Sequence, residues 1–382
     1  MSQLPQFVML VPRLPPMVDG VGDYSFQIAK QLRQMQGHNI QFLVADPEFR
    51  DHSHLEGFEA HTITQRSSQA LLAALDKCNA HQSTVLVQFS GYGFASWGNP
   101  EWLIDGLTEW KVRHSEARLV TMFHELYNKL GYPWQHNFWV HHAQKKIIAD
   151  LANLSQHIVT NLQEYGETLV ALTENANQQI KLLPVFSNVA ELRENLPIQD
   201  RDRSMVIFGQ SHTRQRSYQD STKFIEEICK YLEIDHIIDI GPSTELEFTK
   251  FLNIPVIEKG RLDIEDVSML LNKSLAGFIN YEVKRLAKSG TFAAYCAHGL
   301  IPIVSQDCNL ILDSLEPGRH YISPSSLMPH QELVPSQDIL NHYYLSQISN
   351  RIFDWYQGHN LDAHAKEFSS LLNTSNLPIS KI

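Results

Sequence analysis

Short apolar runs alternate with amphipathic segments along the first half of this chain, a pattern typical of an α/β protein. Residues 6–12 form a nearly continuous apolar run, which predicts a strand that is covered on both faces. Residues 23–36 carry apolar side chains at helical spacing, and Gly37 predicts the end of that helix. The same alternation predicts strands at 38–45, 84–89, 118–123, 157–160 and 180–185, separated by helices at 68–78, 101–113, 139–154 and 164–172.

The alternation starts again in the second half of the chain. It predicts strands at 205–209, 236–241, 254–258, 275–281 and 301–305, with helices at 221–232 and 292–298. Residues 188–204 are rich in charge and contain Pro197, which makes them the predicted linker. Two successive βα series predict two Rossmann-like, doubly wound α/β domains that face each other across a cleft, at residues 1–187 and 188–341. Two further helices, at 342–357 and 362–372, follow without a strand between them, and we expect residues 342–382 to pack back on the first domain.

Composition narrows the classes of function. The chain has 382 residues, of which 43% are apolar, enough for two cores, and its formal charge is −11. Such an acidic balance argues against a general nucleic-acid binder, although it leaves room for a local basic pocket. No apolar run approaches the ~18 residues of a transmembrane helix, and no basic segment precedes the first apolar run as in a signal peptide. The four scattered cysteines lack CxxC spacing, so we expect a cytoplasmic protein with reduced thiols.

Candidate chemistry in the first half lies just after the strands, because ligands of open α/β sheets bind at the carboxyl ends of the strands. Gly20 and Gly22 open a helix after the first strand, where free amides can meet a ligand; the alternative is a tight, proline-stiffened turn. The aromatic residues of 90–98 suit a sugar face or core packing. His124 and Glu125 directly follow the predicted strand 118–123. They are candidates for a polar site; the alternative is that the histidine has only a structural role.

Basic residues gather after two strands of the second half. Five of them fall in two predicted loops: Arg214, Arg216, Lys284, Arg285 and Lys288. Ser289, Gly290 and Thr291 then open a helix, whose amides and dipole favour an anion. Arginine binds phosphate oxygens in a bidentate manner and lysine binds them as a point charge, so the pattern favours a phosphate-bearing ligand. The alternative is a set of solvated loop charges.

These segments, in this order, resemble the GT-B glycosyltransferases of the family 4-like group. The resemblance spans almost the whole chain and rests on five segments: FVMLVPRLPPMVDGVGDYSFQIAKQLRQMQGHNIQFLV, FHELY, LPVFSNV, MVIFGQSHTRQR and LAGFINYEVKRLAKSGTFAAYCAHGLIPIVS. It implies the transfer of a hexose, with retention of anomeric configuration, from a nucleotide-diphosphate sugar to a glycan, lipid-linked or small-molecule acceptor. It implies no metal and no cofactor besides the nucleotide-sugar co-substrate. Contact with the inner membrane surface, through Lys145 and Lys146, is left open.

The resemblance also implies roles for individual residues. Gly20 and Gly22 would lie near the donor phosphates and the acceptor, and His124 near the transferred sugar. Arg214 or Arg216, together with Lys288, would neutralise the nucleoside diphosphate that leaves, because cations held in place stabilise that charge without a metal. Glu282, Ser289, Gly290 and Thr291 complete the predicted donor site.

The sequence departs from the family pattern in one respect, and two other classes of protein are therefore considered as alternatives. Many members carry two glutamates in the donor segment, and the corresponding positions here hold Leu286 and Ala294. Glu282 lies four residues upstream of the first position and does not replace it. The alternative is therefore a catalytically altered GT-B-like protein that binds a glycan or a nucleotide. A nicotinamide dehydrogenase is a third class, against which the absence of a GxGxxG motif argues.

Overall fold

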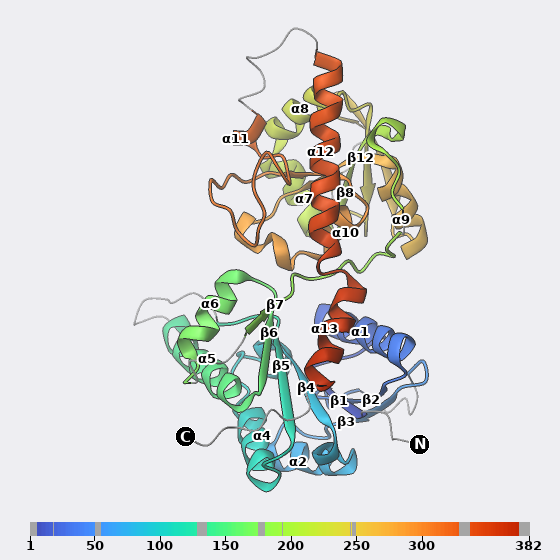
Figure 1. The fold of residues 1–382 in the computed structure, drawn as a ribbon. Coiled ribbons are helices and arrows are strands. Elements are labelled where there is room, and N and C mark those ends of the chain that lie inside the picture. The colour runs from blue at the N-terminus through green and yellow to red at the C-terminus, as the bar shows by residue number, and fades with distance from the viewer. Residues whose placement is uncertain are drawn as a thin grey trace, which may run out of the picture. The chain divides into compact units, whose positions relative to one another are not determined.

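Two β-sheets organise the chain (Figure 1). The computed structural model describes residues 6–17, 19–49, 55–127, 136–174, 180–192, 194–244, 246, 250–327 and 337–373. Contacts divide the chain into unit 1, which comprises Met1–Leu183 and Leu361–Ile382, and unit 2, which comprises Pro184–Asn360. The chain therefore passes from one unit to the other twice, and each unit is described by itself below.

The sheet of unit 1 is parallel throughout its described strands, in the order β3-β2-β1-β4-β5-β6-β7. These strands are β1 (Gln6–Val11), β2 (Asn39–Val44), β3 (Glu59–Thr62), β4 (Thr84–Phe89), β5 (Arg118–Phe123), β6 (His157–Thr160) and β7 (Ile180–Leu182). The strand order reverses between β1 and β4, which is the kind of place where doubly wound sheets bind ligands. Strand β4 is buried along its whole length, as expected of a parallel strand that helices cover on both faces.

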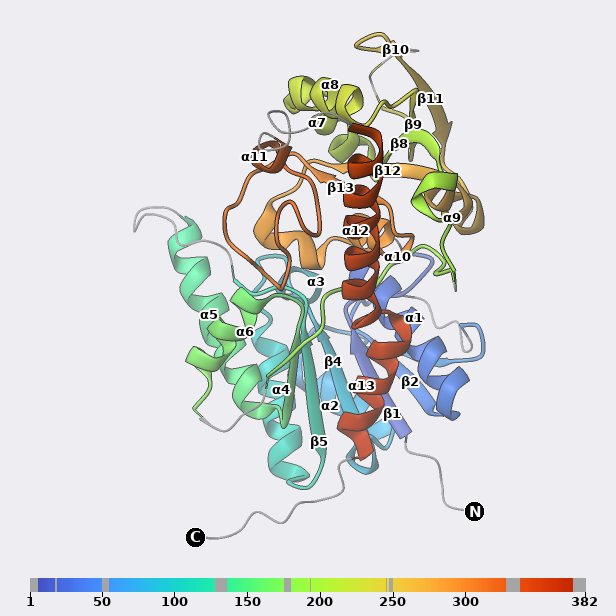
Figure 2. The same cartoon turned by 45° about the horizontal axis from the view of Figure 1, so that its top comes forward.

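Helices flank this sheet: α1 (Gly20–Gln36), α2 (Ser68–Lys77), α3 (Gly91–Phe94), α4 (Glu101–Arg113), α5 (His136–Leu154), α6 (Gln163–Leu172) and α13 (Leu361–Asn373), with the 3-10 turn η1 at Ala80–Gln82. The last of these comes from the far end of the sequence and packs against α1 (Figure 2). The Tyr24 hydroxyl of α1 lies 2.7 Å from Nδ1 of His364, and Lys181 pairs with Glu367 at 3.0 Å. The C-terminal helix is thus part of the first unit.

The sheet of unit 2 has the order β10-β11-β9-β8-β12-β13 and is parallel except for the edge pair β10-β11. Its strands are β8 (Asp202–Phe208), β9 (His236–Ile240), β10 (Lys250–Phe251), β11 (Ile254–Gly260), β12 (Ser274–Ile279) and β13 (Ile301–Val304). Gly277 in β12 leaves room for a ring of the neighbouring helix, because a Cβ there would lie 2.6 Å from the Tyr295 side chain. The Tyr295 hydroxyl in turn accepts from the backbone N–H of Phe208 and ties the helix to β8.

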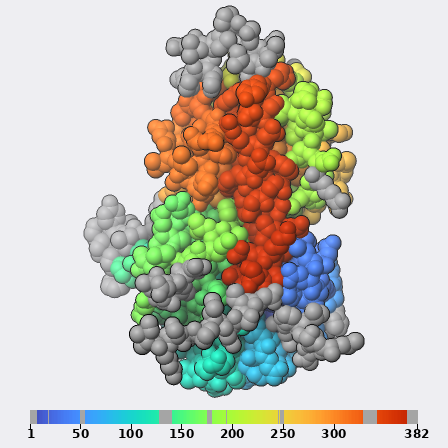
Figure 3. All heavy atoms as spheres, in the orientation of Figure 1, coloured from blue at the N-terminus to red at the C-terminus, as the bar shows by residue number. Residues whose placement is uncertain are grey.

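The helices of unit 2 are α7 (Ser211–Asp220), α8 (Thr222–Tyr231), α9 (Ile264–Lys273), α10 (Gly290–Ala297), α11 (Pro324–Leu327) and α12 (Gln337–Gln357), with 3-10 turns η2 (Ile198–Asp200) and η3 (Val283–Lys288). Helix α12 packs on α10, β13 and η2, and Figure 3 shows it along one face of this unit. Leu345, Ile348, Ile352 and Tyr356 form its buried stripe. Among the described residues, no helix is long and apolar enough to cross a bilayer.

The structure confirms the α/β class and most of the predicted elements, and it changes two points of organisation. The division between the units falls between Leu183 and Pro184 rather than at 187/188, and η2 and the start of β8 occupy part of the predicted linker. The two C-terminal helices separate: α13 belongs to unit 1, whereas α12 belongs to unit 2 because its apolar stripe is buried there. The segment with Arg214 and Arg216, predicted to be a loop, is helix α7.

Candidate functional site

The first candidate region is the start of α1, at the carboxyl end of β1. The Asp19 carboxylate caps this helix and accepts hydrogen bonds from the backbone N–H groups of Val21 (2.8 Å) and Gly22 (2.9 Å). Two amides that were predicted to meet an anion are therefore already bonded. Gly22 is required for another reason, because a Cβ there would lie 2.6 Å from the Arg13 carbonyl oxygen. Gly20 is exposed and has open space around it, so it is the glycine of this pair that a ligand can approach.

Acidic groups surround that helix start. Arg13 pairs with both Asp19 and Asp46, each at 3.3 Å, and so holds the loop after β1 to the end of β2. Asp23 follows one turn into the helix, where burial, and secondarily the charge of Asp19, raise its pKa above the ordinary value. Carboxylates accept hydrogen bonds from hydroxyl groups and repel other anions. This edge of unit 1 therefore suits hydroxyl groups better than a diphosphate.

His124 lies at the carboxyl end of β5, where the sequence predicted it, but it is only 6% exposed. Its Nε2 lies 2.7 Å from the side-chain oxygen of Gln88 on β4. Because that oxygen only accepts, Nε2 donates in this contact. The Tyr24 ring packs edge-on against the imidazole, with centroids 4.8 Å apart. His124 is thus held in one orientation by Gln88 of β4 and Tyr24 of α1, while its contact with a transferred sugar stays a prediction.

The aromatic segment after β4, which includes α3, packs one of its rings in the core and leaves two at the surface. Phe94 is fully buried and packs against Phe89 and Trp102. Tyr92 is 44% exposed and Trp97 is 65% exposed, so these two rings lie at the surface. The loop therefore anchors itself in the core through one ring and presents two others to solvent at the same edge of the sheet as His124.

In unit 2, two glycine loops lie side by side at the carboxyl ends of β8 and β9. Gly209 and Gly241 adopt φ angles of 138° and 147°, in the positive-φ region that L-residues rarely adopt. A Cβ on Gly241 would lie 2.1 Å from the Gly209 carbonyl oxygen, so the two backbones approach too closely for any side chain. The amide of Gly209 donates to the Ile240 carbonyl at 3.1 Å. The two loops therefore pack backbone against backbone at the carboxyl ends of β8 and β9, on the predicted donor side of the sheet.

Arg214 holds these two loops together. It is 2% exposed and pairs with Asp239, which is 3% exposed; its other nitrogens donate to the carbonyls of Gly209 and Pro242. Tyr218 donates to the second Asp239 oxygen at 2.9 Å. Burial raises the pKa of Asp239 above its ordinary value, and the Arg214 charge opposes that shift. The guanidinium that was predicted to bind a diphosphate is thus directed at Asp239 and two carbonyls, and it holds the Gly209 loop in place.

The amino terminus of α10 adjoins the Gly209 loop. Ser289 caps the helix by accepting from the Phe292 amide at 3.2 Å. The Thr291 hydroxyl oxygen lies 3.6 Å from the place a Cβ would take on Gly209, so the first turn of α10 faces that loop directly. The amides of Gly290 and Thr291 stand in this first turn, where a helix offers donors without intrahelical partners. The Gly209 loop and this helix start form a cradle whose candidate anion donors are the α10 amides, because the Gly209 amide already donates to the Ile240 carbonyl.

The cations predicted for the donor site differ in their exposure and in their ion pairing. Lys288 directly precedes the Ser289 cap and is partly exposed. Arg216 on α7 has a side chain that is 63% exposed and pairs with Asp220 at 3.6 Å, a surface pair worth little. Glu282 pairs with Arg285 at 3.2 Å within the same turn, so its carboxylate is partly neutralised locally. Of the predicted cations, Lys284 and Lys288 are partly exposed and Arg216 is exposed, whereas Arg214 is enclosed.

The two positions where the family has glutamates are buried. Leu286 is 1% exposed and Ala294 is 0% exposed, and both pack in the interior of unit 2. A carboxylate at either position would have to leave the surrounding apolar packing, so this chain has no equivalent donor contact from them.

Several residues that shape the site had not been singled out. Asp239 is the clearest example: a carboxylate inside the apolar strand HIIDIG is a recognisable signal of a buried partner. Gln88 lies in the otherwise apolar β4 and gives the same kind of signal. Asp19 at a helix N-cap was also readable from sequence, because aspartate is preferred there. Among the described residues, no group of three or more His, Cys, Asp or Glu could hold a metal ion.

Comparisons with known proteins place the chain by its fold. No protein-family model and no curated protein matches its sequence. Solved structures do match over nearly the full length. Sucrose-phosphate synthase from Thermosynechococcus elongatus shares 12% identity, with 96% of this chain and 98% of that chain covered and a TM-score of 0.59. TarM shares 8% identity at a TM-score of 0.63, with 98% and 99% covered. Anabaena HepE, solved with UDP-glucose, shares 12% identity at a TM-score of 0.56, with 96% and 100% covered.

These neighbours define the class of the fold. They are GT-B glycosyltransferases, and so the chain has the GT-B fold, with two Rossmann-like units. The resemblance inferred from the sequence is thereby confirmed for the architecture. At identities of 8–12% the likeness speaks for the fold.

Proposed function

We propose that this protein transfers a sugar from a nucleotide-diphosphate sugar to a hydroxyl-bearing acceptor, without a metal ion. The observation that carries the proposal is the cradle in unit 2, where the Gly209 loop meets the amino terminus of α10. Its fold neighbours support the choice of ligand, since HepE was solved with UDP and glucose and with UDP-glucose. WaaB, at a TM-score of 0.53, is a lipopolysaccharide outer core galactosyltransferase. Hexosyl transfer with retention of configuration is the finer form of the proposal.

Sugar transfer from a nucleotide-diphosphate sugar requires stabilisation of the diphosphate that leaves. Breaking the bond between the sugar and the diphosphate builds negative charge on the phosphate oxygens. The amides of Gly290 and Thr291 and the positive end of the α10 dipole act on that charge from fixed positions. Lys288 and Arg216 add full positive charges beside them. Arg214 contributes indirectly, because it fixes the Gly209 loop against which the diphosphate would lie.

The acceptor side is proposed for unit 1. The carboxylates of Asp19 and Asp23 lie at one strand end and the exposed rings of Tyr92 and Trp97 at another. Carboxylates accept hydroxyl hydrogen bonds and aromatic rings pack on the apolar faces of sugars, so this edge suits a carbohydrate acceptor. His124, which the contact with Gln88 holds in place, is proposed to contact the transferred sugar.

Calorimetric titration tests the donor part of the proposal. UDP-, GDP- and ADP-sugars are titrated into the wild type, into Lys288→Ala and into Lys273→Ala. Lys273 is an exposed lysine in the last turn of α9, at the opposite edge of the sheet, and serves as the matched control. Loss of one charge-assisted contact costs about 1.5–3 kcal/mol, so Lys288→Ala should weaken binding by about 10- to 150-fold while the control binds as the wild type does.

One result would refute the proposal, and another would limit it to donor binding without sugar transfer. If no nucleotide-sugar binds the folded wild type, donor recognition is refuted. If a donor binds but neither hydrolysis nor transfer occurs with any acceptor in a glycan panel, the protein is the catalytically altered binding protein instead. A turnover that His124→Ala abolishes, with donor binding retained, supports catalysis. Membrane contact through Lys145 and Lys146 stays a prediction, and cosedimentation with anionic liposomes at low salt tests it.

A further inference from the structure

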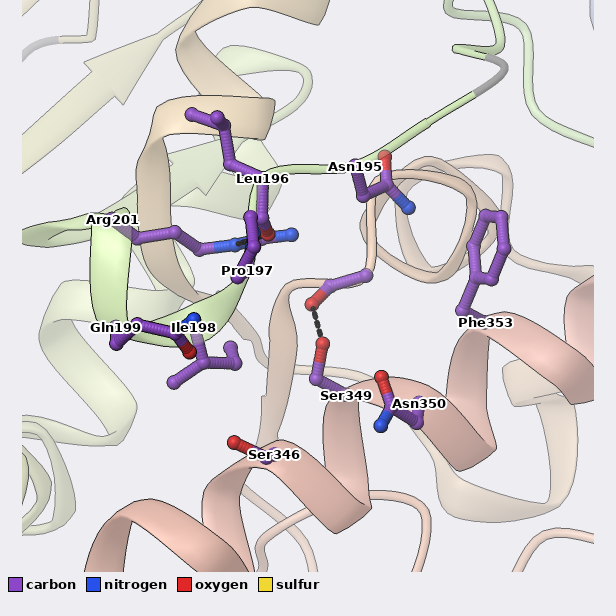
Figure 4. Close-up of a pocket in the computed structure, with 11 residues that line it drawn as sticks. Asn195, Leu196, Pro197, Ile198, Gln199, Arg201, Ser346, Ser349, Asn350 and Phe353 are labelled. Carbon is purple, nitrogen blue, oxygen red and sulfur yellow. Dashed lines mark hydrogen bonds between the residues drawn. The ribbon is translucent and has the colours of Figure 1, made fainter.

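A polar cavity lies in unit 2, at the edge of the sheet opposite the donor cradle. Its volume is about 260 Å³, and Figure 4 shows the residues that line it. One wall is the segment 195–201 that leads into β8, and the other is a face of α12 that includes Ser346, Ser349 and Asn350. Gly299, in the turn before β13, joins the two walls. No residue proposed above for sugar transfer takes part.

The charge in this cavity comes from Arg201. This arginine is 7% exposed and lies just before β8. It donates to the carbonyls of Leu196 (2.9 Å), Ser274 (3.1 Å) and His298 (2.8 Å). Within the part of the chain that the structure describes, no carboxylate pairs with it, and three bonds leave two of its five N–H groups unused. Burial lowers the pKa of Arg201 to about 10, so the side chain remains a cation at neutral pH.

Neighbouring polar groups are held in place but are incompletely bonded. Asn195 donates to the Ala297 carbonyl at 3.3 Å and Ser349 to that of Gly299 at 2.6 Å, so both are fixed by the end of α10. The Asn195 side-chain oxygen is buried without a hydrogen-bond partner. Among the described residues, the side chains of Ser346 and Asn350 also make no hydrogen bond with the protein. Arg201, Asn195 and Ser349 are thus held in place in the cavity wall, and Ser346 and Asn350 line the same cavity with unused hydrogen-bonding capacity.

We propose that this cavity binds a small phosphorylated polyol, of the monosaccharide phosphate class. The Arg201 cation suits an oxyanion, because charge-assisted hydrogen bonds to phosphate are strong and a buried cation without a counter-ion is costly. The amides and hydroxyls of Asn195, Ser346 and Asn350 both donate and accept, as sugar hydroxyls require. Phe353 supplies an apolar face beside them. Ligand pockets for drug-sized molecules start near about 300 Å³, so a cavity of about 260 Å³ selects a compact ligand.

The cavity is separate from the donor cradle. Arg201 precedes β8 and Gly209 follows it, and a strand of 7 residues spans about 20 Å. A ligand of this size therefore occupies the cavity without touching the Gly209 loop or α10's amino terminus. Binding here is read without turnover, so its failure and the failure of the proposed sugar transfer give different results.

Calorimetric titration with glucose 6-phosphate, and separately with glucose, tests the proposal on the full chain. Ser346→Phe fills the cavity from α12, and Gln347→Phe on the same helix is the matched control, because position 347 does not line the cavity. Arg201→Gln removes the charge, and its fold is checked by circular dichroism. We expect glucose 6-phosphate to bind the wild type at least about tenfold more tightly than glucose does, because the phosphate adds a charge-assisted contact. Ser346→Phe should abolish this binding, the control should retain it, and saturating UDP should leave it unchanged.

Four outcomes would overturn the proposal. Absence of saturable binding at about 10 mM glucose 6-phosphate, with the wild type folded, removes the site. Equal affinity for glucose and glucose 6-phosphate removes the role of Arg201. Unchanged binding in Ser346→Phe places the ligand elsewhere, and displacement by UDP places it on the donor edge. If Arg201→Gln fails to fold, the Ser346→Phe and Gln347→Phe pair still decides.

Discussion

Acidification is expected to destabilise unit 2 through one buried histidine, His298. This residue is 0% exposed at the end of α10. Its Nδ1 donates to the Ala294 carbonyl at 2.8 Å, and its Nε2 lies 2.8 Å from the Ser268 hydroxyl. Burial, and secondarily the charge of Arg201 nearby, lower the pKa of His298 from 6.5 to about 4, although the hydrogen bond to the Ala294 carbonyl opposes the shift. The folded unit therefore holds His298 neutral well below neutral pH.

The sign and size of the effect follow from linkage. Between about pH 4 and pH 6.5 the unfolded histidine binds a proton that the folded one does not, so the unfolding free energy falls as the pH is lowered through this window. A difference of about 2.5 pKa units at 1.36 kcal/mol each gives about 3 kcal/mol for the full window. Going from about pH 7.5 to about pH 4.5 should remove about 2.5 kcal/mol of it.

The assay must read unit 2 alone, because two units need not unfold together. Trp355 is the only tryptophan between residues 184 and 360, so its fluorine resonance in 5-fluorotryptophan protein reports that unit during urea unfolding. His298→Gln removes the titrating group, and the wild type should lose its advantage over this variant by about 2.5 kcal/mol across the pH range. Burial also lowers the pKa of His320, so His320→Gln serves as the comparison for a second histidine. Parallel curves for the wild type and His298→Gln would refute the reasoning.

Two further predictions concern residues of the candidate site. Gly22→Ala should lower the unfolding free energy of unit 1 by about 1–3 kcal/mol, because the new methyl group meets the Arg13 carbonyl, whereas Gly20→Ala should be neutral or slightly stabilising. Urea unfolding followed by tryptophan fluorescence measures both, and equal effects would contradict this account of Gly22. Arg214→Ala should cost unit 2 about 3–5 kcal/mol because it leaves the Asp239 charge buried and unpaired. The double variant Arg214→Met with Asp239→Leu should recover most of that loss, and strictly additive losses in the same unfolding assay would argue against a coupled pair.

Much of the architecture could be predicted because its signals are local. The apolar runs of β4, β5 and β6 and the amphipathic α4 were predicted at their observed bounds, since a covered strand and a half-buried helix each leave a periodic pattern in sequence. Helix α9 was missed although Val267, Leu271 and Ser268 form its buried side. The short β3 was also missed, because four residues carry too little pattern to stand out.

The candidate site was predictable in place but only partly in role. Parallel strands put their carboxyl ends at one edge, so Gly20, His124 and Ser289 were expected in the segments after strands, and they follow β1, β5 and β12. Their partners come from distant parts of the chain. The residues near Arg214 in the sequence do not indicate that Asp239, 25 residues away, neutralises the Arg214 charge.

By itself, the sequence determined the α/β class, the two successive βα series, the acidic balance and the loss of the paired glutamates, because each is carried by residue type and local spacing. Only the tertiary structure decided that Asp19 occupies the amides of α1, that Arg214 is enclosed, that α12 and α13 join different units, and that Arg201 lies buried without a carboxylate partner among the described residues. The physical reason is the same in each case. Burial and charge pairing depend on which groups folding brings within about 4 Å, and residues far apart in sequence make those contacts.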